Sequence, residues 1–315
     1  MARLQNVVSK LSAWFGRSRR GGSQIGVFVT PDGIAAAKVL QRAGKPRLER
    51  CVYEKESSND SFARVLDRMP SRRVPTVSVL DPGDYRLLLV EAPDVPAEEL
   101  RAAVRWRVKD LIDFHIDDAV IDVFEMPPHA RGGRTRMMYA VTAKSELVKQ
   151  AIDRVEGAGL TLDAVDIAEL SLRNVAMLLD SDQRGAAFLH LGERRSTLLL
   201  VRQGILYLAR HIETGVATLA EAGELRPELV AGLALEVRRS LDYVESHYEQ
   251  PAIAQLDVSG LEMADREQIA RELGLSVREV DLATLFDTDQ TFSPELQRLC
   301  MPAVGAALRR DVIAL

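Results

Sequence analysis

The chain has 315 residues, of which 47% are hydrophobic and 28% are charged, and its net charge at pH 7 is −5. These values are typical of a globular protein with roughly two domains, and the negative charge argues against nucleic acid as the main partner. The two cysteines, Cys51 and Cys300, lie outside any CxxC pattern, and the histidines lack the spacing of metal ligands. The sequence therefore predicts no disulfide framework, no metal site and a reducing, cytoplasmic location.

The first 24 residues form a basic leader, with five basic residues and no acidic one. Hydrophobic residues recur there at three- and four-residue spacing, which predicts an amphipathic helix: Leu4, Val7, Val8, Leu11, Trp14 and Phe15. We expect residues 1–20 to contact an anionic membrane surface or a partner, the alternatives being a helix packed on the domain and a disordered tail. Gly21-Gly22-Ser23 is expected to be a flexible joint. No apolar run approaches the about 20 residues needed to cross a bilayer.

A first β-hairpin is expected over Ile25–Leu40, with its turn at Thr30-Pro31-Asp32-Gly33. The elements expected after it are the strands Cys51–Lys55, Pro75–Leu80 and Tyr85–Glu91 and the helix Ser61–Met69.

From Tyr85 to Ile167 the expected order is strand, helix, strand, strand, helix, strand. The first of these helices is expected over Pro96–Asp110, because proline suits the first turn and acidic residues follow it. The strands that follow the first are expected over Ala119–Glu125, Arg136–Thr142 and Leu160–Ile167, and the second helix over Lys144–Ala158. This order predicts a βαββαβ subdomain, over about residues 92–160, inserted in a larger fold.

Residues 186–215 repeat the outline of the first hairpin. Their apolar runs Ala186–Leu191, Leu198–Val201 and Ile205–Arg210 are typical of strands buried on both faces. Two such hairpins half a chain apart predict an internally duplicated fold. The remaining elements are expected as helices over Val216–Glu221, Arg226–Leu233, Leu235–Tyr248, Asp265–Leu273 and Leu299–Arg310 and strands over Gln255–Ser259 and Ser276–Val280.

The domains follow from these elements. We expect the leader at residues 1–24 and a first lobe at 25–180 that contains the inserted subdomain. A second lobe is expected at 181–315, with a smaller subdomain at about 216–254.

Six segments, in this order along the body of the chain, match the sequence pattern of one protein family: Val95–Leu100, Trp106–Asp113, Ala119–Pro127, Gly204–Gly215, Leu235–Tyr243 and Ala303–Arg310. Together they resemble the actin-like proteins of type IV pilus biogenesis, the PilM group, and most closely its MshI-type members of the MSHA pilus. The resemblance implies an α/β fold of the actin/Hsp70 type, with duplicated RNase H-like lobes, a nucleotide between them and an inserted subdomain in the first lobe.

The same resemblance implies partners and a location. It implies a cytoplasmic protein, peripheral to the inner membrane, that binds the N-terminal tail of a PilN-type bitopic protein. Other pilus assembly components and a second copy of the chain are further expected partners.

The nucleotide site implied by the resemblance lacks its acidic residues. Relatives carry Asp-x-Gly-Ser/Thr in the first hairpin, where this chain has Phe28-Val29-Thr30-Pro31, and Asp-x-Gly in the second, where it has His190-Leu191-Gly192. A Gly-Gly turn near the nucleoside is reduced to Ser259-Gly260-Leu261. Mg²⁺ needs oxygen ligands, and the missing carboxylates would have supplied them. Binding of ATP and Mg²⁺ therefore stays open, and ATP hydrolysis is not expected. The residues that remain for nucleotide binding are Thr30, Gly33, Gly192, Ser196, Thr197, Gly215, Glu236, Arg239, Ser240 and Gly260.

Candidate contacts for the tail lie on the helix Pro96–Asp110 and the strand Ala119–Glu125, near the loop Arg131–Arg134. They are Val104, Trp106, Val108, Val120 and Val123. The leading interpretation is a pseudo-ATPase that acts as a scaffold. The alternatives are an active actin-fold ATPase or kinase, and the cytoplasmic part of a type II secretion L-type protein.

Overall fold

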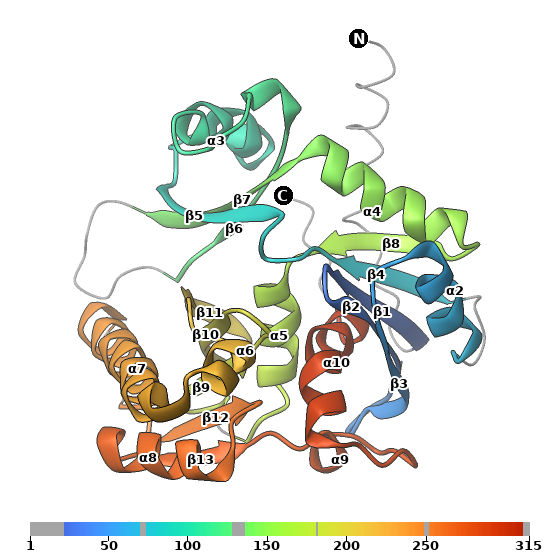
Figure 1. Cartoon of the computed structure of the whole chain (residues 1–315). Helices are drawn as coiled ribbons and strands as arrows, with labels where there is room; N and C mark the ends of the chain where they lie inside the picture. Colours follow the sequence, from blue (N-terminus) through green and yellow to red (C-terminus); the bar gives the residue numbers. More distant parts are fainter. Residues whose placement is uncertain (1–21, 70–73, 128–135, 181, 249–251, 311–315) are drawn as a thin grey trace. The chain divides into compact units, whose positions relative to one another are not determined.

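A computed structural model describes residues 22–69, 74–127, 136–180, 182–248 and 252–310 (Figure 1). The predicted leader helix and the Arg131–Arg134 loop lie outside these residues. No helix in the described ranges is long and apolar enough to span a membrane.

The first sheet has five strands in the order β3-β2-β1-β4-β8. Their bounds are β1 Gly22–Thr30, β2 Gly33–Gln41, β3 Arg47–Lys55, β4 Pro75–Val79 and β8 Thr161–Asp166. The strand β1 pairs antiparallel with β2 and parallel with β4, while β2–β3 is antiparallel and β4–β8 is parallel. Gly22 and Ser23 pair with Gln41 and Leu40 of β2, so the expected flexible joint is wrong for these two residues.

The second sheet has five strands in the order β11-β10-β9-β12-β13. Their bounds are β9 Ala186–Leu191, β10 Ser196–Arg202, β11 Ile205–Ile212, β12 Gln255–Ser259 and β13 Ser276–Glu279. Here β9 pairs antiparallel with β10 and parallel with β12, β10–β11 is antiparallel and β12–β13 is parallel. The two sheets therefore share one topology, which confirms the predicted duplication. Every residue of β9 is buried, as expected for a continuous apolar run that forms a strand covered on both faces.

A third, three-stranded sheet has the order β5-β7-β6. Its strands are β5 Tyr85–Glu91, β6 Ala119–Glu125 and β7 Met137–Lys144, with α3 (Leu100–Val108) between β5 and β6 in the chain. The predicted βαββαβ order is present, but β8 pairs with β4 in the first five-stranded sheet. The inserted sheet therefore begins at Tyr85 and ends at Lys144, because the last strand of the pattern is taken by the larger sheet.

The helices have the following bounds: α2 Asn59–Asp67, α4 Ser145–Gly157, α5 Ala168–Ala176, α6 Val216–Glu221, α7 Arg226–Tyr248, α8 Met263–Leu273, α9 Leu282–Leu285 and α10 Pro294–Ala307. Three short 3₁₀ helices are η1 Ala97–Glu99, η2 Ile116–Asp118 and η3 Gly223–Leu225. The two helices predicted on either side of residue 234 are one helix, α7, because Ala234 is buried and carries no break signal. The helix α8 ends at Gly274, whose φ of 69° is the left-handed conformation that glycine favours.

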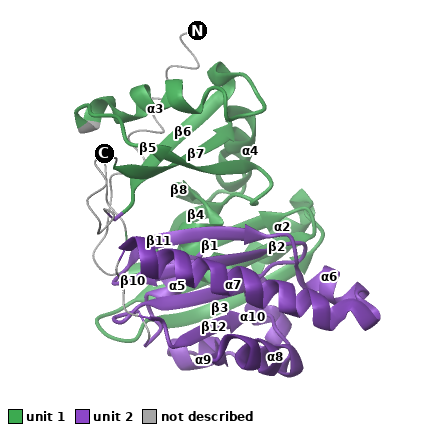
Figure 2. Cartoon of the chain, turned by 90° about the vertical axis from the view of Figure 1, so that its left-hand side faces the viewer, with its two compact units in different colours: residues 1–126, 134–171, 302–315 green, residues 127–133, 172–301 purple. Residues whose placement is uncertain are grey.

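Two compact units divide the chain (Figure 2). Unit 1 comprises residues 1–126, 134–171 and 302–315, and unit 2 comprises 127–133 and 172–301. The division differs from the expected boundary after residue 180, because it falls within α5 and gives the end of α10 to unit 1. Close packing explains the second difference: a Cβ on Gly26 of β1 would lie 1.9 Å from the Ala303 carbonyl oxygen of α10.

Candidate functional site

The turn of the first hairpin, in unit 1, satisfies its polar groups internally. Thr30 Oγ1 donates to the Gly33 carbonyl at 3.2 Å, and the Tyr53 hydroxyl donates to the Asp32 carbonyl at 2.9 Å. Gly33 has a packing role, because a Cβ there would lie 2.3 Å from Tyr53 Oη. These contacts account for the presence of Thr30 and Gly33 at this turn without a bound nucleotide.

Phe28 stands in β1 where relatives are expected to carry a carboxylate. Its half-buried side chain packs against a hydrophobic cluster of unit 1 that includes Val77, Ala164 and Ala306. A carboxylate in such surroundings would lose hydration without gaining a partner. This position therefore supplies apolar packing instead of a charge for a metal.

The second hairpin, in unit 2, brings Gly192, Ser196 and Gly215 into one hydrogen-bonded turn. The Gly192 amide donates to the Arg195 carbonyl at 3.0 Å, and Ser196 Oγ donates to the Thr214 carbonyl at 2.5 Å. A Cβ on Gly215 would lie 2.4 Å from the Glu193 carbonyl oxygen, so glycine allows the close approach of the two chain segments. The amide that a phosphate would need is thus already bonded within the protein.

His190 lies in the middle of the second sheet, opposite Thr197 of β10 and Ser259 of β12. Burial, and then the positive charge of Arg298, lower the pKa of His190 to about 3. Its Nδ1 has no hydrogen-bond partner among the described residues. The imidazole is therefore neutral at pH 7 and cannot replace the negative charge of an aspartate beside Mg²⁺.

The space beside Gly260 is filled by Arg298 of α10. A Cβ on Gly260 would lie 2.5 Å from Arg298 Cδ, and the Arg298 side chain is only 8% exposed. The Arg298 guanidinium pairs with Glu193 at 3.1 Å, and the Gly260 amide donates to the Glu279 carboxylate at 3.0 Å. The sequence does not single out Arg298 or Glu279, because neither lies in a motif near Gly260.

The remaining nucleotide candidates form a separate group on α7. Glu236 pairs with Arg210 of β11 through Oε2 and with Arg239 through Oε1, both at 2.8 Å. Ser240 is fully buried and donates to the Glu236 backbone carbonyl at 2.7 Å. Each of these side chains has a partner in the protein, and a group of surface ion pairs of this kind contributes little to stability.

The described residues contain no group of three or more His, Cys, Asp or Glu side chains that could hold a metal ion. Thr30 and Gly33 lie in unit 1, and the other eight nucleotide candidates lie in unit 2.

The predicted partner contacts on the inserted subdomain divide into buried and exposed residues. Val104 and Val108 of α3 and Val123 of β6 belong to the subdomain's hydrophobic core, with at most 3% exposure. They cannot contact a partner directly, which corrects that part of the prediction. Val120 is half-buried against a second cluster that includes Tyr85 and Val148.

Trp106 is 73% exposed, the most exposed large hydrophobic side chain in the described part of the chain. Leu89 of β5 and Leu111, just after α3, are also exposed, at 45% and 54%. An ion pair between Arg107 and Glu91 at 3.2 Å joins α3 to the end of β5. Leu88 and Val90 pack in the core beneath α3, so Leu89, which lies between them on β5, is on the face of the sheet away from α3.

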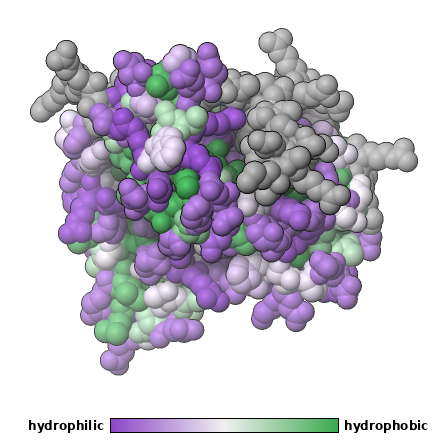
Figure 3. Space-filling view, turned by 90° about the horizontal axis from the view of Figure 1, so that it is seen from above, coloured by the Kyte–Doolittle hydropathy of each residue, from purple (hydrophilic) through white to green (hydrophobic). Residues whose placement is uncertain are grey.

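The sequence pattern missed Leu89 and Leu111, because it shows which residues are apolar but not which of them remain uncovered. On the face shown in Figure 3, hydrophobic residues occur in small areas among hydrophilic ones.

No protein-family model matches the chain, and no curated protein sequence matches it. Among solved structures, the chain is similar to one from a PilM–PilN type IV pilus biogenesis complex, with a TM-score of 0.70 and 19% identity over 92% of this chain and 98% of that one.

It is also similar to the cytoplasmic domain of EpsL, an inner-membrane component of the type II secretion system of Vibrio cholerae. The TM-score is 0.51 and the identity 9%, over 90% of this chain and 95% of that one. A Bacteroides thetaiotaomicron protein with an actin-like ATPase fold and unknown function gives a TM-score of 0.46 at 10% identity, over 88% of this chain and 95% of that one. The chain has an actin-like fold, similar to that found in the PilM–PilN complex.

Proposed function

We propose that this protein is a non-catalytic, cytoplasmic scaffold of an inner-membrane type IV pilus assembly complex, and that it binds the N-terminal tail of a PilN-type bitopic protein. The observation that carries the proposal is the similarity to a chain of the PilM–PilN complex over 92% of this chain and 98% of that one. Within this group, we assign it to the MshI type of MSHA-like pili, on the segments that carry that resemblance.

Four features of the described residues support a role without ATP hydrolysis. Phe28 and His190 are uncharged where the family resemblance implies carboxylates, the Gly192 amide is bonded within its own turn, and Arg298 fills the space beside Gly260. Each of these features removes one requirement for holding a nucleotide and its metal.

The exposed Trp106 of α3, on the inserted subdomain, supports this partner. A tail that enters from a membrane protein is expected to be apolar and to contain Asn and Leu, and exposed Trp and Leu side chains suit it. Trp residues are frequent among the few side chains that dominate the energy of an interface.

The test is the binding of a synthetic peptide of the PilN-type tail to the full chain, measured by isothermal titration calorimetry. We expect Trp106→Ala to weaken binding about 30-fold, as expected for a loss of about 2 kcal/mol. Met263→Ala is the matched control, because Met263 is 68% exposed and lies in unit 2. Equal affinities of both variants for the peptide would remove Trp106 from the interface, and no binding by the unchanged chain would contradict the proposed partner.

The similarity to the EpsL cytoplasmic domain favours a second candidate, a part of a type II secretion complex. Co-purification from cells that contain both systems separates the two. Recovery of a PilN-type protein supports the pilus assignment, and recovery of secretion-system components supports the second candidate.

A further inference from the structure

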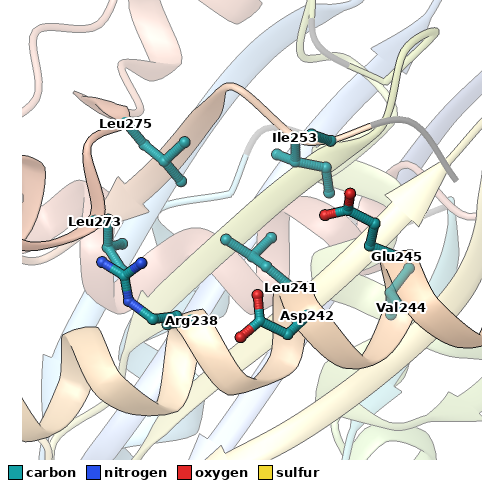
Figure 4. Close-up of a pocket in the computed structure, with 9 residues that line it drawn as sticks. Arg238, Leu241, Asp242, Val244, Glu245, Ile253, Leu273 and Leu275 are labelled. Atoms are coloured by element: carbon teal, nitrogen blue, oxygen red, sulfur yellow. The ribbon is translucent and has the colours of Figure 1, made fainter.

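A groove in unit 2 lies between α7 and the segments that follow it (Figure 4). Its volume is about 170 Å³. Five apolar side chains line it, of which Val244 is buried and the others are half-buried: Leu241, Val244, Ile253, Leu273 and Leu275. All residues that line the groove belong to unit 2. The groove therefore leaves apolar surface uncovered along one side of α7.

Three charged side chains stand on the α7 side of this groove. Figure 4 shows Arg238, Asp242 and Glu245 in this order along the helix, with Leu241 between the first two. All three charged residues are exposed, and neither carboxylate pairs with a residue in the described part of the chain. The Arg238 guanidinium donates to the Glu272 carbonyl at the end of α8 and keeps its positive charge. The rim therefore changes from positive to negative along α7.

The order of these charges disfavours two simple occupants. An anionic membrane surface would meet the carboxylates of Asp242 and Glu245, and a uniformly basic segment would meet the charge of Arg238. The groove instead fits a segment that carries negative charge at one end, positive charge at the other and an apolar residue between them. This is the pattern of α7 itself when the direction of the helix is reversed.

Two copies of α7 that lie antiparallel complement each other in this way. Arg238 and Glu245 are equally far from a two-fold axis that crosses the helix just after Leu241, about 5 Å along the helix on either side. Each Arg238 therefore faces the partner's Glu245, and the two Leu241 side chains meet beside the axis. Leu235, which is 47% exposed, lies one turn before Arg238 on the same side and extends the apolar strip.

We propose that two copies of this protein associate through α7, antiparallel and related by a two-fold axis, so that each copy covers the groove of the other. The ion pairs at the two ends fix the register, and the apolar side chains between them exclude water. The contact lies on unit 2 of each copy and needs neither the tail nor a nucleotide, so it goes beyond the proposed function and does not depend on it. One helix face buries less than a standard interface, so we expect a weak dimer with a dissociation constant of about 100 µM.

The test is sedimentation equilibrium of the full chain at loading concentrations of about 10 to 500 µM, which bracket this dissociation constant. Arg238→Glu alone, or Glu245→Arg alone, should weaken association about tenfold, because two exposed ion pairs are replaced by repulsion. An equimolar mixture of the two variants should associate as strongly as the unchanged protein, because opposite charges then face each other at both ends. Recovery in the mixture also shows that both variants are folded.

The matched controls are Arg271→Glu and Glu267→Arg, which make the same changes in charge at exposed positions of α8 outside the groove lining. They should leave association unchanged, both alone and mixed. An unchanged protein that stays monomeric throughout overturns the proposal and leaves the groove to a segment of another protein. A dimer that is insensitive to Arg238→Glu and Glu245→Arg overturns it as well, and so does a mixture that associates as weakly as its components.

Discussion

His190 is a basic side chain held without charge in the second sheet. Its pKa of about 3 lies below the ordinary value of 6.5, because burial disfavours the imidazolium and Arg298 repels it. As the pH falls through about 6.5, the unfolded chain binds a proton at this residue, whereas the folded chain does not until about pH 3. His190 therefore makes the folded state less stable as the pH decreases through this window.

The expected size of this effect is about 2 kcal/mol at pH 5, relative to pH 7. Replacing the residue, as in His190→Leu, removes it. Urea unfolding of both proteins at pH 7 and pH 5 measures the difference, and the unchanged protein should lose more stability on acidification. Burial raises the pKa of Glu279, which has the opposite effect on stability but is common to both proteins. Equal losses would mean that His190 takes up its proton in the folded state.

Val104 and Trp106 are two positions apart on α3, yet one is fully buried and the other is 73% exposed. The spacing of Leu100, Val104 and Val108 identifies the apolar face of the helix correctly, since these residues form the subdomain core. A partner contact, however, must come from the side that the fold leaves uncovered. Trp106 is the better target for mutation, because replacing Val104 would perturb the core and confuse unfolding with loss of binding.

At the scale of elements, the end of α10 packs closely on other parts of unit 1. A Cβ on Gly305 would lie 1.9 Å from the Ser171 carbonyl oxygen of α5, and a Cβ on Gly26 would lie equally close to Ala303 of α10. Both approaches involve backbone atoms, which cannot turn aside as a flexible side chain can. These glycines explain why residues distant in the sequence belong to one unit.

Gly26→Ala should therefore destabilise the protein by about 3 kcal/mol, the upper part of the range for overpacked cores. The matched control is Gly157→Ala at the end of α4, where a Cβ would meet no atom within 4 Å. That change should be neutral or stabilise the protein by up to about 1 kcal/mol, because alanine favours the helix. Thermal or urea unfolding of the two variants compares them, and similar stabilities would contradict the packing argument.

At the scale of the whole molecule, two sheets of the same topology build an actin-like fold, and each holds an uncharged residue at a position where the family resemblance implies a carboxylate. Unit 1 has Phe28 in an apolar cluster, and unit 2 has neutral His190 and buried Arg298. We propose that the nucleotide site is altered in both halves of the duplication, so that restoring one position alone would leave the other unsuited to a metal-bound triphosphate.

We expect isothermal titration with ATP and Mg²⁺ to show no saturable binding up to about 1 mM. The same nucleotide should raise the free energy of unfolding by less than about 0.1 kcal/mol, as for a dissociation constant above about 10 mM. Titration with Mg²⁺ alone and with ATP alone provides the controls. Micromolar, Mg²⁺-dependent affinity accompanied by release of phosphate would contradict the scaffold proposal and favour an active ATPase.

The sequence by itself determined the local elements and the duplication. Continuous apolar runs located strands of both five-stranded sheets, and α8 ends at Leu273 as expected, because such signals depend on the burial and backbone conformation of nearby residues. The bounds of β5 and β6 were predicted without error. That Phe28 and His190 replace carboxylates stays a prediction from the family resemblance.

Only the tertiary structure decided which sheet β8 joins, which apolar side chains remain exposed, and what fills the space beside Gly260. Each of these depends on contacts between residues far apart in the chain, such as Glu193 with Arg298. A local sequence pattern does not determine such contacts, because the same apolar or charged residue can pack against many different partners. The fold therefore follows largely from the sequence, whereas the chemistry of its surfaces follows from how the elements pack.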